Sequence, residues 1–461
     1  MDCVPHIDRL PLTRQMIWLR ENLENFVVAI LMALTIRHYV IEPFQIPTGS
    51  MATTLLGQHA MVLCPQCRWE FPRGMSSQTG QIPRVHKCPH CLQVIDVKDK
   101  DMQRWGGEKI LADKFTFRLM SPDRYDTVVF RPPGQYVNYI KRAVSLGGET
   151  IFLLQGDLWV RKEIGDQRYL APKPKEVQDQ VWLPVYDMAH DIKATTFFEL
   201  GEGWARNSDE KGKTQAYSFK NKSGKAKLVW KRQGKKQIKD EISYNAENYK
   251  GGRKIVGDLK IEGEYLLSDH KKGEFTLHMT DGDLNFEINI GKKNQIVCYG
   301  KNKNKKFSFG KRMSTLTNNK AVNFVFQNWD DQIILEINGE TVVAQSSVTD
   351  LRTNMEKVGY HDQDGFSFSV SGADAEVNAI KVWRDIYYSG GKNGMDYFWE
   401  VPEGHFFAMG DNTNNSQDSR GPKFSFIPLQ RIQGRPWLHS IHWDVSKPFS
   451  PHRDWRVGRV Y

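Results

Sequence analysis

The sequence predicts a mainly β protein that carries an N-terminal transmembrane helix, and three observations support this prediction. Apolar and polar residues alternate in several short segments, for example at Val322, Phe324 and Phe326, which is the period of a half-buried strand. An uninterrupted apolar run extends from Phe26 to Ile36. Four of the six cysteines form two C-x-x-C pairs, a spacing typical of metal sites.

Length and composition limit the class of protein. At 461 residues the chain has room for two or three domains of roughly 150 residues each. Six cysteines are too few for a disulfide-dense scaffold. The formal charge of +10 is typical of a protein that meets anionic surroundings such as lipid headgroups, although solvated lysine-rich loops at 220–239 and 301–306 explain it equally well.

Residues 23–44 are predicted to form a single membrane anchor, preceded by a cytoplasmic segment at 1–22. A bilayer span needs about 20 residues, which is more than the apolar run contains. The span reaches this length if it continues to Phe44, with the charged end of Arg37 extended to the membrane surface. The competing interpretation is a cleaved signal peptide, but no small-x-small cleavage site follows the run. A cytoplasmic N-terminus, with the body outside, is favoured by the basic residues that precede the run: Arg9, Arg14 and Arg20.

Two inserts interrupt the rest of the chain. The first, at 63–97, carries the paired cysteines. The second, at 185–391, is predicted to be a β-sandwich, because strand-like segments recur along it and the turn-forming pairs Asp281-Gly282 and Asn338-Gly339 stand between them. Nearly all residues with a chemical interpretation lie in the remaining pieces, which are predicted to form one catalytic domain: 45–62, 98–184 and 392–461.

Three segments contain candidate catalytic residues. In IPTGSMATTL, Ser50 follows a glycine that permits a sharp turn. In YIKRAVSLGGE, Lys141 lies in a partly apolar run, and burial lowers a lysine pKa toward the value at which its amine can deprotonate a serine. In GDNTNNSQDSR, Asp418 and Arg420 are suited to a charge-assisted pair that fixes the loop. Taken singly, the segments are equally typical of a turn, an exposed strand lysine and a solvated loop.

Together, and in this order, the three segments resemble the conserved boxes of bacterial type I signal peptidases: P-S-G-S-M-x-P-T-L, K-R-x-x-G-x-P-G-D and G-D-N-R-x-N-S-x-D-S-R. The segment YDTVVFRPP at 125–133 resembles the strand between the first two boxes, and the apolar run resembles the anchor that leads into the first. The resemblance implies an antiparallel β catalytic fold whose site faces the membrane. The two inserts lie outside the segments that carry this resemblance.

The resemblance also implies a role for each matching residue. Ser50 matches the nucleophile and Lys141 the general base of a Ser-Lys dyad. Thr48 matches the residue whose hydroxyl joins the backbone N–H of Ser50 in the oxyanion hole. The supporting residues stand in the third box: Ser416, which orients the lysine, and the pair Asp418 and Arg420.

Several positions depart from the boxes. Thr53 replaces the proline of the first box, and Thr413 replaces the arginine of the third. The second box differs at Ser145, Gly147 and Glu149. The nucleophile, the base and the orienting serine are all retained, so these departures bear on loop geometry and substrate preference rather than on catalysis.

The two inserts have resemblances of their own. Cys64, Cys67, Cys88 and Cys91 have the spacing of a zinc ribbon, in which four thiolates close a structural Zn²⁺ site that leaves no position for chemistry. Two disulfides are the alternative if the region is extracytoplasmic. The second insert resembles concanavalin-like and laminin-G-like sandwiches, chiefly through AEVNAIKVWRDIYY at 375–388, and its ligand is left open between carbohydrate and protein.

The resemblance thus implies a single-pass serine endopeptidase of the cytoplasmic membrane, with its catalytic domain on the extracytoplasmic face, that removes signal peptides from exported preproteins through an acyl-enzyme. Catalysis needs no cofactor, the substrates present small residues at the first and third positions before the cut, and membrane lipid is a second partner. Nucleic acid is not expected. Self-cleaving repressors share the dyad but cut at Ala-Gly or Cys-Gly, and neither dipeptide occurs here. The non-enzymatic alternative is a membrane-tethered binding protein on an inactive peptidase scaffold.

Overall fold

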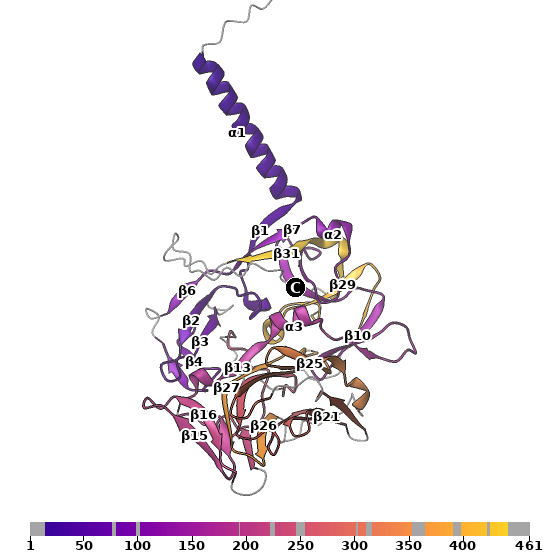
Figure 1. Cartoon of the computed structure of the whole chain (residues 1–461). Helices are drawn as coiled ribbons and strands as arrows, with labels where there is room; N and C mark the ends of the chain where they lie inside the picture. The colour runs from indigo at the N-terminus through magenta and orange to yellow at the C-terminus, as the bar shows by residue number, and fades with distance from the viewer. Residues whose placement is uncertain are drawn as a thin grey trace, which may run out of the picture.

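The computed structural model describes residues 14–75, 80–97, 102–192, 194–221, 226–245, 254–300, 303–309, 316–352, 365–390, 398–421 and 425–440. These residues form a β-rich body from which one long helix, α1 (Arg14–Tyr39), projects (Figure 1). All paired strands are antiparallel, so the mainly β prediction is confirmed. Parts of the expected N-terminal segment and of the expected C-terminal piece, residues 1–13 and 441–461, lie outside the described residues.

The body is built on two sheets whose strands come from both ends of the chain. The seven-stranded sheet has the order β1 (Ile41–Gln45), β7 (Lys109–Asp113), β31 (Ile432–Ser440), β8 (Thr127–Phe130), β9 (Tyr139–Ser145), β29 (His405–Met409) and β30 (Ile427–Pro428). The four-stranded sheet has the order β12 (Tyr169–Leu170), β11 (Asp157–Arg161), β10 (Glu149–Leu154) and β28 (Phe398–Val401). Two short helices accompany them, α2 (Thr116–Leu119) and α3 (Lys175–Val181).

The paired cysteines lie in a small separate region with two sheets of its own. One sheet is formed by β3 (Glu70–Gly74), β2 (His59–Leu63) and β6 (Gln103–Trp105), and the other by β4 (Val85–Lys87) and β5 (Val94–Asp96). Strands β2 and β6 pair with each other, although most of β2 and all of β6 lie outside the expected insert, 63–97. The region therefore extends beyond the predicted boundaries on both sides.

The second insert forms two large sheets. The first contains β15 (Trp204–Ser208), β16 (Thr214–Phe219), β27 (Ala375–Arg384), β18 (Leu259–Leu267), β23 (Ala321–Trp329), β24 (Gln332–Ile337) and β25 (Glu340–Ser347), with β13 (Leu183–Asp187) paired to β27. The second contains β14 (Phe198–Leu200), β17 (Ala226–Trp230), β26 (Gly365–Ser371), β19 (Glu274–Asp281), β20 (Leu284–Gly291), β21 (Gln295–Tyr299) and β22 (Asn304–Ser308).

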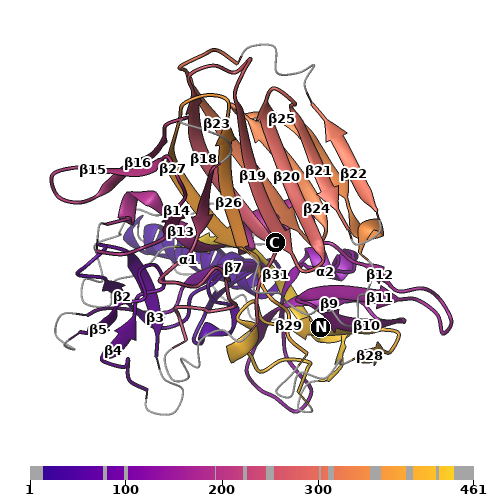
Figure 2. The same ribbon diagram turned by 90° about the horizontal axis from the view of Figure 1, so that it is seen from below.

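These two sheets pack face to face around one apolar core (Figure 2). In β18 every second side chain is buried, as the strand period requires. The predicted turn at Asn338-Gly339 joins β24 to β25, with both residues at positive φ, as a two-residue hairpin turn demands. The sandwich begins slightly earlier than expected, because β13 starts at Leu183.

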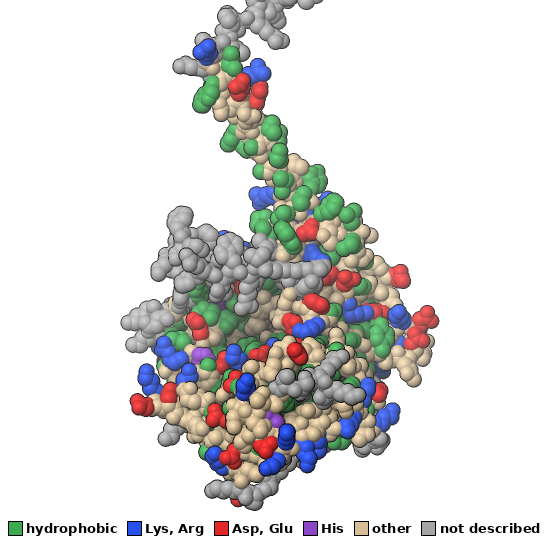
Figure 3. All heavy atoms as spheres, viewed as in Figure 1, with side chains coloured by type: hydrophobic (Ala, Val, Ile, Leu, Met, Phe, Trp, Pro, Cys, Tyr) green, Lys and Arg blue, Asp and Glu red, His purple; other side chains and the backbone are tan. Residues whose placement is uncertain are grey.

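The N-terminal helix differs from the predicted anchor at both ends. It begins at least as early as Arg14 and ends at Tyr39, and residues 41–44 belong to β1 rather than to a helix. Its apolar side chains from Phe26 onward are exposed, and they cover the part of the helix next to the body (Figure 3). Within the described residues, none of the helices combines the length and the apolar character that a membrane span requires.

Candidate functional site

Ser50 lies in a single turn of 3-10 helix, η1 (Gly49–Met51), shortly after β1. Its side chain is half-buried, whereas Met51 beside it is fully buried in the small core under the seven-stranded sheet and anchors the turn. A Cβ at Gly49 would lie 1.8 Å from the ring of Tyr244, so only glycine fits there. The half-buried serine is therefore held in place by a turn in which both of its chain neighbours are buried.

Lys141 lies in β9, between β8 and β29, and is 3% exposed. Its amine donates a hydrogen bond of 2.5 Å to the Oγ of Ser50 and one of 2.9 Å to the carbonyl oxygen of Ile140. The structure thus brings the two residues of the expected dyad into direct contact, although they are 91 positions apart in the chain.

Burial lowers the pKa of Lys141 to about 8, because a charged ammonium loses its hydration in the interior. The carboxylates of Asp418 and Asp411 act in the opposite direction, and the guanidinium of Arg420 adds to the decrease. A large share of the amine is therefore neutral near pH 8. A neutral amine next to a serine hydroxyl is the arrangement that general-base activation requires.

The third segment supports the nucleophile turn from the side. Asn412 donates its backbone N–H to the carbonyl oxygen of Ser50 at 3.1 Å, and its side-chain amide donates to the carbonyl oxygen of Gly49 at 2.8 Å. Gly410 lies equally close, since a Cβ there would come within 2.3 Å of the same Ser50 oxygen. The loop after β29 therefore fixes the backbone on which the nucleophile stands.

Asp418 and Arg420 form a buried bidentate ion pair, with N–O distances of 2.8 and 2.7 Å. Burial raises the pKa of Asp418, but the hydrogen bond and charge of Arg420 outweigh it, so the pKa lies below its usual value. Arg420 also donates to the carbonyl oxygens of Ser389 and Thr413. The pair thus closes the loop on itself and on the chain that returns from the sandwich.

Ser416 and Thr48, the two other single residues expected in the site, do not make a contact as direct as that of the dyad. The Oγ of Ser416 is buried and interacts with the Asp418 carboxylate, and the two hydrogen bonds of the Lys141 amine go to other atoms. The orienting hydrogen bond expected from Ser416 to the lysine is therefore not formed here. Thr48 is exposed and directly precedes the turn that carries Ser50, with an extended backbone.

Three positions that depart from the family boxes make contacts of their own. Glu149 forms a bidentate ion pair with Arg124 at 2.7 and 2.8 Å. Gly147 has a φ of 87°, and a Cβ there would lie 2.4 Å from the carbonyl oxygen of Pro402. Thr413 donates its hydroxyl to the carbonyl oxygen of Tyr387. These replacements are accommodated by the local structure without reaching the dyad.

Sequence reasoning missed a contribution of the second insert to the site. Tyr244 and Asn245 come from a segment between β17 and β18, yet Tyr244 packs against the nucleophile turn and Asn245 against the loop that supports it. The side chain of Asn245 exchanges hydrogen bonds with that of Asn412, and the hydroxyl of Tyr244 donates to the carbonyl oxygen of Gln58. No motif marks these residues, because their role depends on a tertiary contact across 167 positions.

A buried ion pair next to the dyad was also missed. Arg142, the residue after the candidate base, binds Asp411 through two hydrogen bonds of 2.8 and 2.7 Å, and both side chains are inaccessible to solvent. The arginine also donates to the carbonyl oxygen of Tyr125. The adjacent K-R and G-D pairs in the two boxes are the sequence signal that could have suggested this contact.

The four paired cysteines converge in the small region beside the body. Their sulfur atoms all lie within 4.8 Å of one another and all four are buried. The closest pairs, Cys64 with Cys91 and Cys67 with Cys88, are 3.6 Å apart, and none of the four forms a disulfide. The arrangement has the ligand number and chemistry of a structural zinc site.

Comparisons with known proteins point to one family. The signal peptidase, peptidase S26, family model matches residues 91–230 and 331–440. Signal peptidase I of Rickettsia typhi is 25% identical over 239 residues, which are 46% of this chain and 80% of that protein. Signal peptidase I of Pseudomonas aeruginosa is 26% identical over 155 residues, covering 33% of this chain and 41% of that one.

Solved structures similar to part of the chain include two whose names refer to carbohydrate or galectin. A carbohydrate-binding module of Bacillus subtilis has 12% identity and a TM-score of 0.25, and covers 41% of this chain and 96% of its own. Sheep galectin-11 has 12% identity and a TM-score of 0.19, and covers 28% of this chain and 90% of its own. Scores this low support no statement about fold or ligand. The family model, in contrast, matches more than half of the chain, which therefore belongs to the signal peptidase, peptidase S26, family of serine peptidases.

Proposed function

We propose that this peptidase removes signal peptides from exported preproteins, with Ser50 as nucleophile and Lys141 as general base. The observation that carries the proposal is the 2.5 Å contact between the Lys141 amine and the Ser50 hydroxyl, in a position where burial lowers the lysine pKa to about 8. The family membership supports signal peptides as the substrate class. Neither the chemistry nor the geometry calls for a catalytic cofactor.

The proposed reaction has two steps that share one base. The neutral Lys141 amine accepts the proton of the Ser50 hydroxyl as the oxygen attacks the scissile carbonyl, and the ammonium then protonates the leaving amine. Water then attacks the ester carbonyl as it loses a proton to Lys141, the bond to the Ser50 oxygen breaks, and that oxygen regains its proton from the Lys141 ammonium as the signal peptide leaves with a free carboxyl group. The oxyanion of both steps is assigned to the backbone N–H of Ser50 and the hydroxyl of Thr48, whose exposed position beside the turn leaves its side chain accessible to a substrate.

The support residues act by positioning. The Asp418–Arg420 pair and Asn412 hold the loop that contacts the nucleophile turn. Ser416 is assigned an orienting role that requires its hydroxyl to turn from Asp418 toward Lys141 when substrate is bound, and its support is that the Oγ is buried beside Gly410 in the loop that contacts the nucleophile turn. Substrates with small residues at the first and third positions before the cut remain the expected class.

We also propose that α1 attaches the enzyme to the cytoplasmic membrane, with the body on the extracytoplasmic face. The support is the uninterrupted apolar segment from Phe26 to Ile36, whose side chains are exposed on every side of the helix. Such a surface is stable in lipid and costly in water. The helix leads directly into β1, and the nucleophile turn follows four residues after β1, so an anchored helix would hold the site close to the membrane.

A structural zinc ion is the proposed occupant of the cysteine cluster. A tetrahedral Zn²⁺ with bonds of about 2.3 Å places its sulfur ligands about 3.8 Å apart, close to the 3.6 Å observed, whereas a disulfide requires about 2.05 Å. Zinc content measured by mass spectrometry should be one per chain and should fall to near zero in Cys64→Ser. The sandwich, for which carbohydrate or protein remains the candidate ligand, has a hollow of about 510 Å³ lined by polar and aromatic residues of β17, β19, β20, β21 and β26.

The test of the proposed function is cleavage of a preprotein with a small-x-small site by the intact protein in liposomes. Ser50→Ala and Lys141→Ala should abolish cleavage, while the controls Ser208→Ala, at an exposed serine, and Lys175→Ala, at a half-buried lysine of α3, should retain it. Cleavage that survives both dyad substitutions would exclude the dyad. No cleavage by any folded form would favour the membrane-tethered binding protein instead.

A further inference from the structure

A second cluster of chemically active residues lies where the body meets the sandwich, and the peptidase reaction does not use it. Six aspartates are buried there, contributed by β11, the start of β18, the β19–β20 turn, the β23–β24 turn and the end of β27. They are Asp157, Asp258, Asp281, Asp330, Asp331 and Asp385. Two basic side chains, Lys173 and Arg352, lie among them. If all are ionised, four negative charges are uncompensated in the interior.

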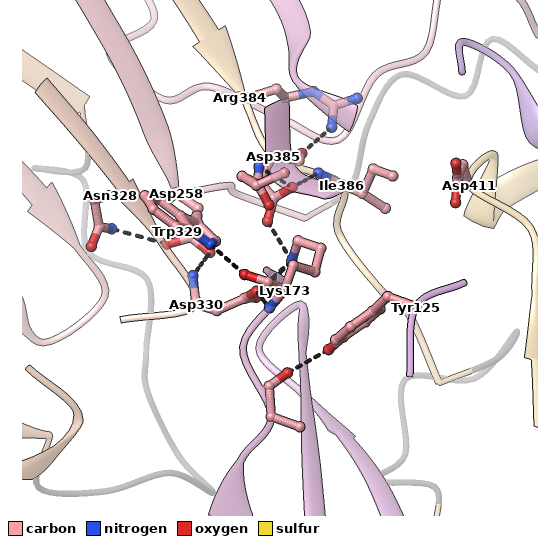
Figure 4. A network of polar contacts seen from close by, with 12 residues as sticks. Tyr125, Lys173, Asp258, Asn328, Trp329, Asp330, Arg384, Asp385, Ile386 and Asp411 are labelled. Carbon is pink, nitrogen blue, oxygen red and sulfur yellow. Dashed lines mark hydrogen bonds and ion pairs between the residues drawn. The ribbon is translucent and has the colours of Figure 1, made fainter. Parts of the chain in front are cut away.

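The two cations already have partners. The amine of Lys173 binds both oxygens of Asp330 at 2.7 Å and one oxygen of Asp385 at 2.8 Å (Figure 4). Arg352 binds Asp281 at 2.5 Å and Asp331 at 2.6 Å. Neither cation forms an ion pair with Asp157 or Asp258 within the described residues. The excess charge therefore lies on those two carboxylates.

Asp258 still has neutral donors. Its oxygens accept hydrogen bonds of 2.9 Å from the side-chain amide of Asn328 and 3.1 Å from the backbone N–H of Asp330 (Figure 4). Asp157 is 6% exposed, and within the described residues its carboxylate takes part in none of the hydrogen bonds or ion pairs, although the charges of Arg352 and Lys173 act on it from a greater distance. A buried carboxylate without a hydrogen-bond donor or counter-ion costs folding free energy. The surroundings of Asp157 therefore indicate a partner that the protein itself does not supply.

Three of the carboxylates converge on one position, where such a partner would lie. One oxygen from each of Asp157, Asp258 and Asp330 lies within 4.8 Å of the others, so that the three converge on one point. A cavity of about 10 Å³ next to them is lined by Asp157, Asp258 and Asp281, with Arg352 also at its wall and Asp330 outside it. This volume accommodates a single ion or water molecule and is too small for an organic ligand.

We propose that Asp157, Asp258 and Asp330 bind one calcium ion that fastens the sandwich to the peptidase body. Calcium accepts carboxylate oxygens in irregular geometry, whereas magnesium demands an octahedral shell of short bonds. The ligands come from both sides of the junction, since Asp157 begins β11 of the body and the other two belong to the sandwich. The ion neutralises the repulsion among the carboxylates and so makes the junction rigid.

The test measures calcium content and thermal stability of the full chain. After passage over a chelating resin and restoration of one equivalent of zinc, the protein is equilibrated with millimolar CaCl₂, and calcium and zinc are counted separately by mass spectrometry. The intact protein and the exposed control Asp350→Asn should bind one calcium each and unfold several degrees higher with calcium than without it. Asp157→Asn should bind none, and its Tm should not respond to calcium.

A second readout covers the case in which a variant does not fold. Terbium should replace calcium in the intact protein and emit light when the 13 tryptophans are excited, by energy transfer from Trp329 next to Asp330, and calcium should displace it. Absence of calcium from the intact protein at millimolar concentration, or unchanged binding by Asp157→Asn, would overturn the proposal. A Tm that ignores calcium but rises on acidification would overturn it too, because the cluster would then hold protons in place of a cation.

Discussion

Cleavage by this enzyme should depend on pH through the protonation of Lys141. Burial lowers the pKa of this residue to about 8, whereas an exposed lysine titrates near 10.4. At pH 7 the neutral fraction of the amine is then about 9%, against about 0.04% for an exposed lysine, a gain of about 200-fold in active base. The same shift corresponds to about 3 kcal/mol of differential stabilisation of the neutral form.

The assay is kcat/KM for a peptide substrate across the pH range. Because Lys141 acts as a base only when neutral, kcat/KM should rise tenfold per pH unit below about 8 and reach a plateau above it. A plateau already reached near pH 6, or a rise that continues past about pH 10, would refute the assignment of Lys141 as the base.

Two variants test the sign of the argument. Asp418 raises the pKa of Lys141 and Arg420 lowers it. Asp418→Asn should therefore move the rising limb to lower pH and Arg420→Gln should move it to higher pH, while the exposed control Asp179→Asn should leave it in place. If the rising limbs of the two variants moved in the same direction, a change in the shape of the loop, and not the loss of charge, would be the cause.

Three further substitutions test the supports of the site. Tyr244→Ala should cost about 3–5 kcal/mol of unfolding free energy in urea because it leaves a cavity beside Gly49, whereas Tyr244→Phe loses one hydrogen bond and should cost about 1 kcal/mol. Arg142→Met should destabilise by about 3–5 kcal/mol, measured the same way, since it leaves the Asp411 carboxylate buried and unpaired. Gly410→Ala should lower kcat about 100-fold and also lower the Tm, because its Cβ would meet the carbonyl oxygen of the nucleophile and the Oγ of Ser416 at 2.3 Å and displace them.

Each of these expectations has a contrary outcome. Equal losses for the alanine and phenylalanine variants of Tyr244 would show that the hydroxyl, and not the ring, supports the nucleophile turn. An Arg142→Met protein as stable as the parent would mean that Asp411 finds another partner or a proton. Full activity in Gly410→Ala would show that the turn tolerates displacement.

The sequence could place the dyad but not everything that supports it. Ser50, Lys141 and the Asp418–Arg420 pair stand in local motifs, and local motifs are readable without a structure because the chemistry lies within a few residues. The contact of Tyr244 with Gly49 and the Arg142–Asp411 pair join residues far apart in the chain. Such contacts follow from how the strands pair, which no local pattern specifies.

The fold likewise contains features that the local sequence predicts and features that it does not. Alternation and the Asn338-Gly339 turn predicted the hairpins of the sandwich, since strand period and turn chemistry are local properties. The limits of the inserts were less accurate: β2 and β6 pair across the expected boundary of the cysteine region, and residues 41–44 join the sheet as β1. Boundaries depend on which partner a strand finds, and an apolar strand and the end of an apolar helix look alike in sequence.

The central claim is that an ester forms on Ser50 when Lys141 is neutral. The most direct measurement is peptide mapping by mass spectrometry after a rapid acid quench of the intact enzyme with its preprotein. The account predicts an acyl adduct on the peptide that contains Ser50, formed at pH 8 and absent in Lys141→Ala. An adduct on another residue, or an adduct on the Ser50 peptide that forms equally well in Lys141→Ala, would contradict it.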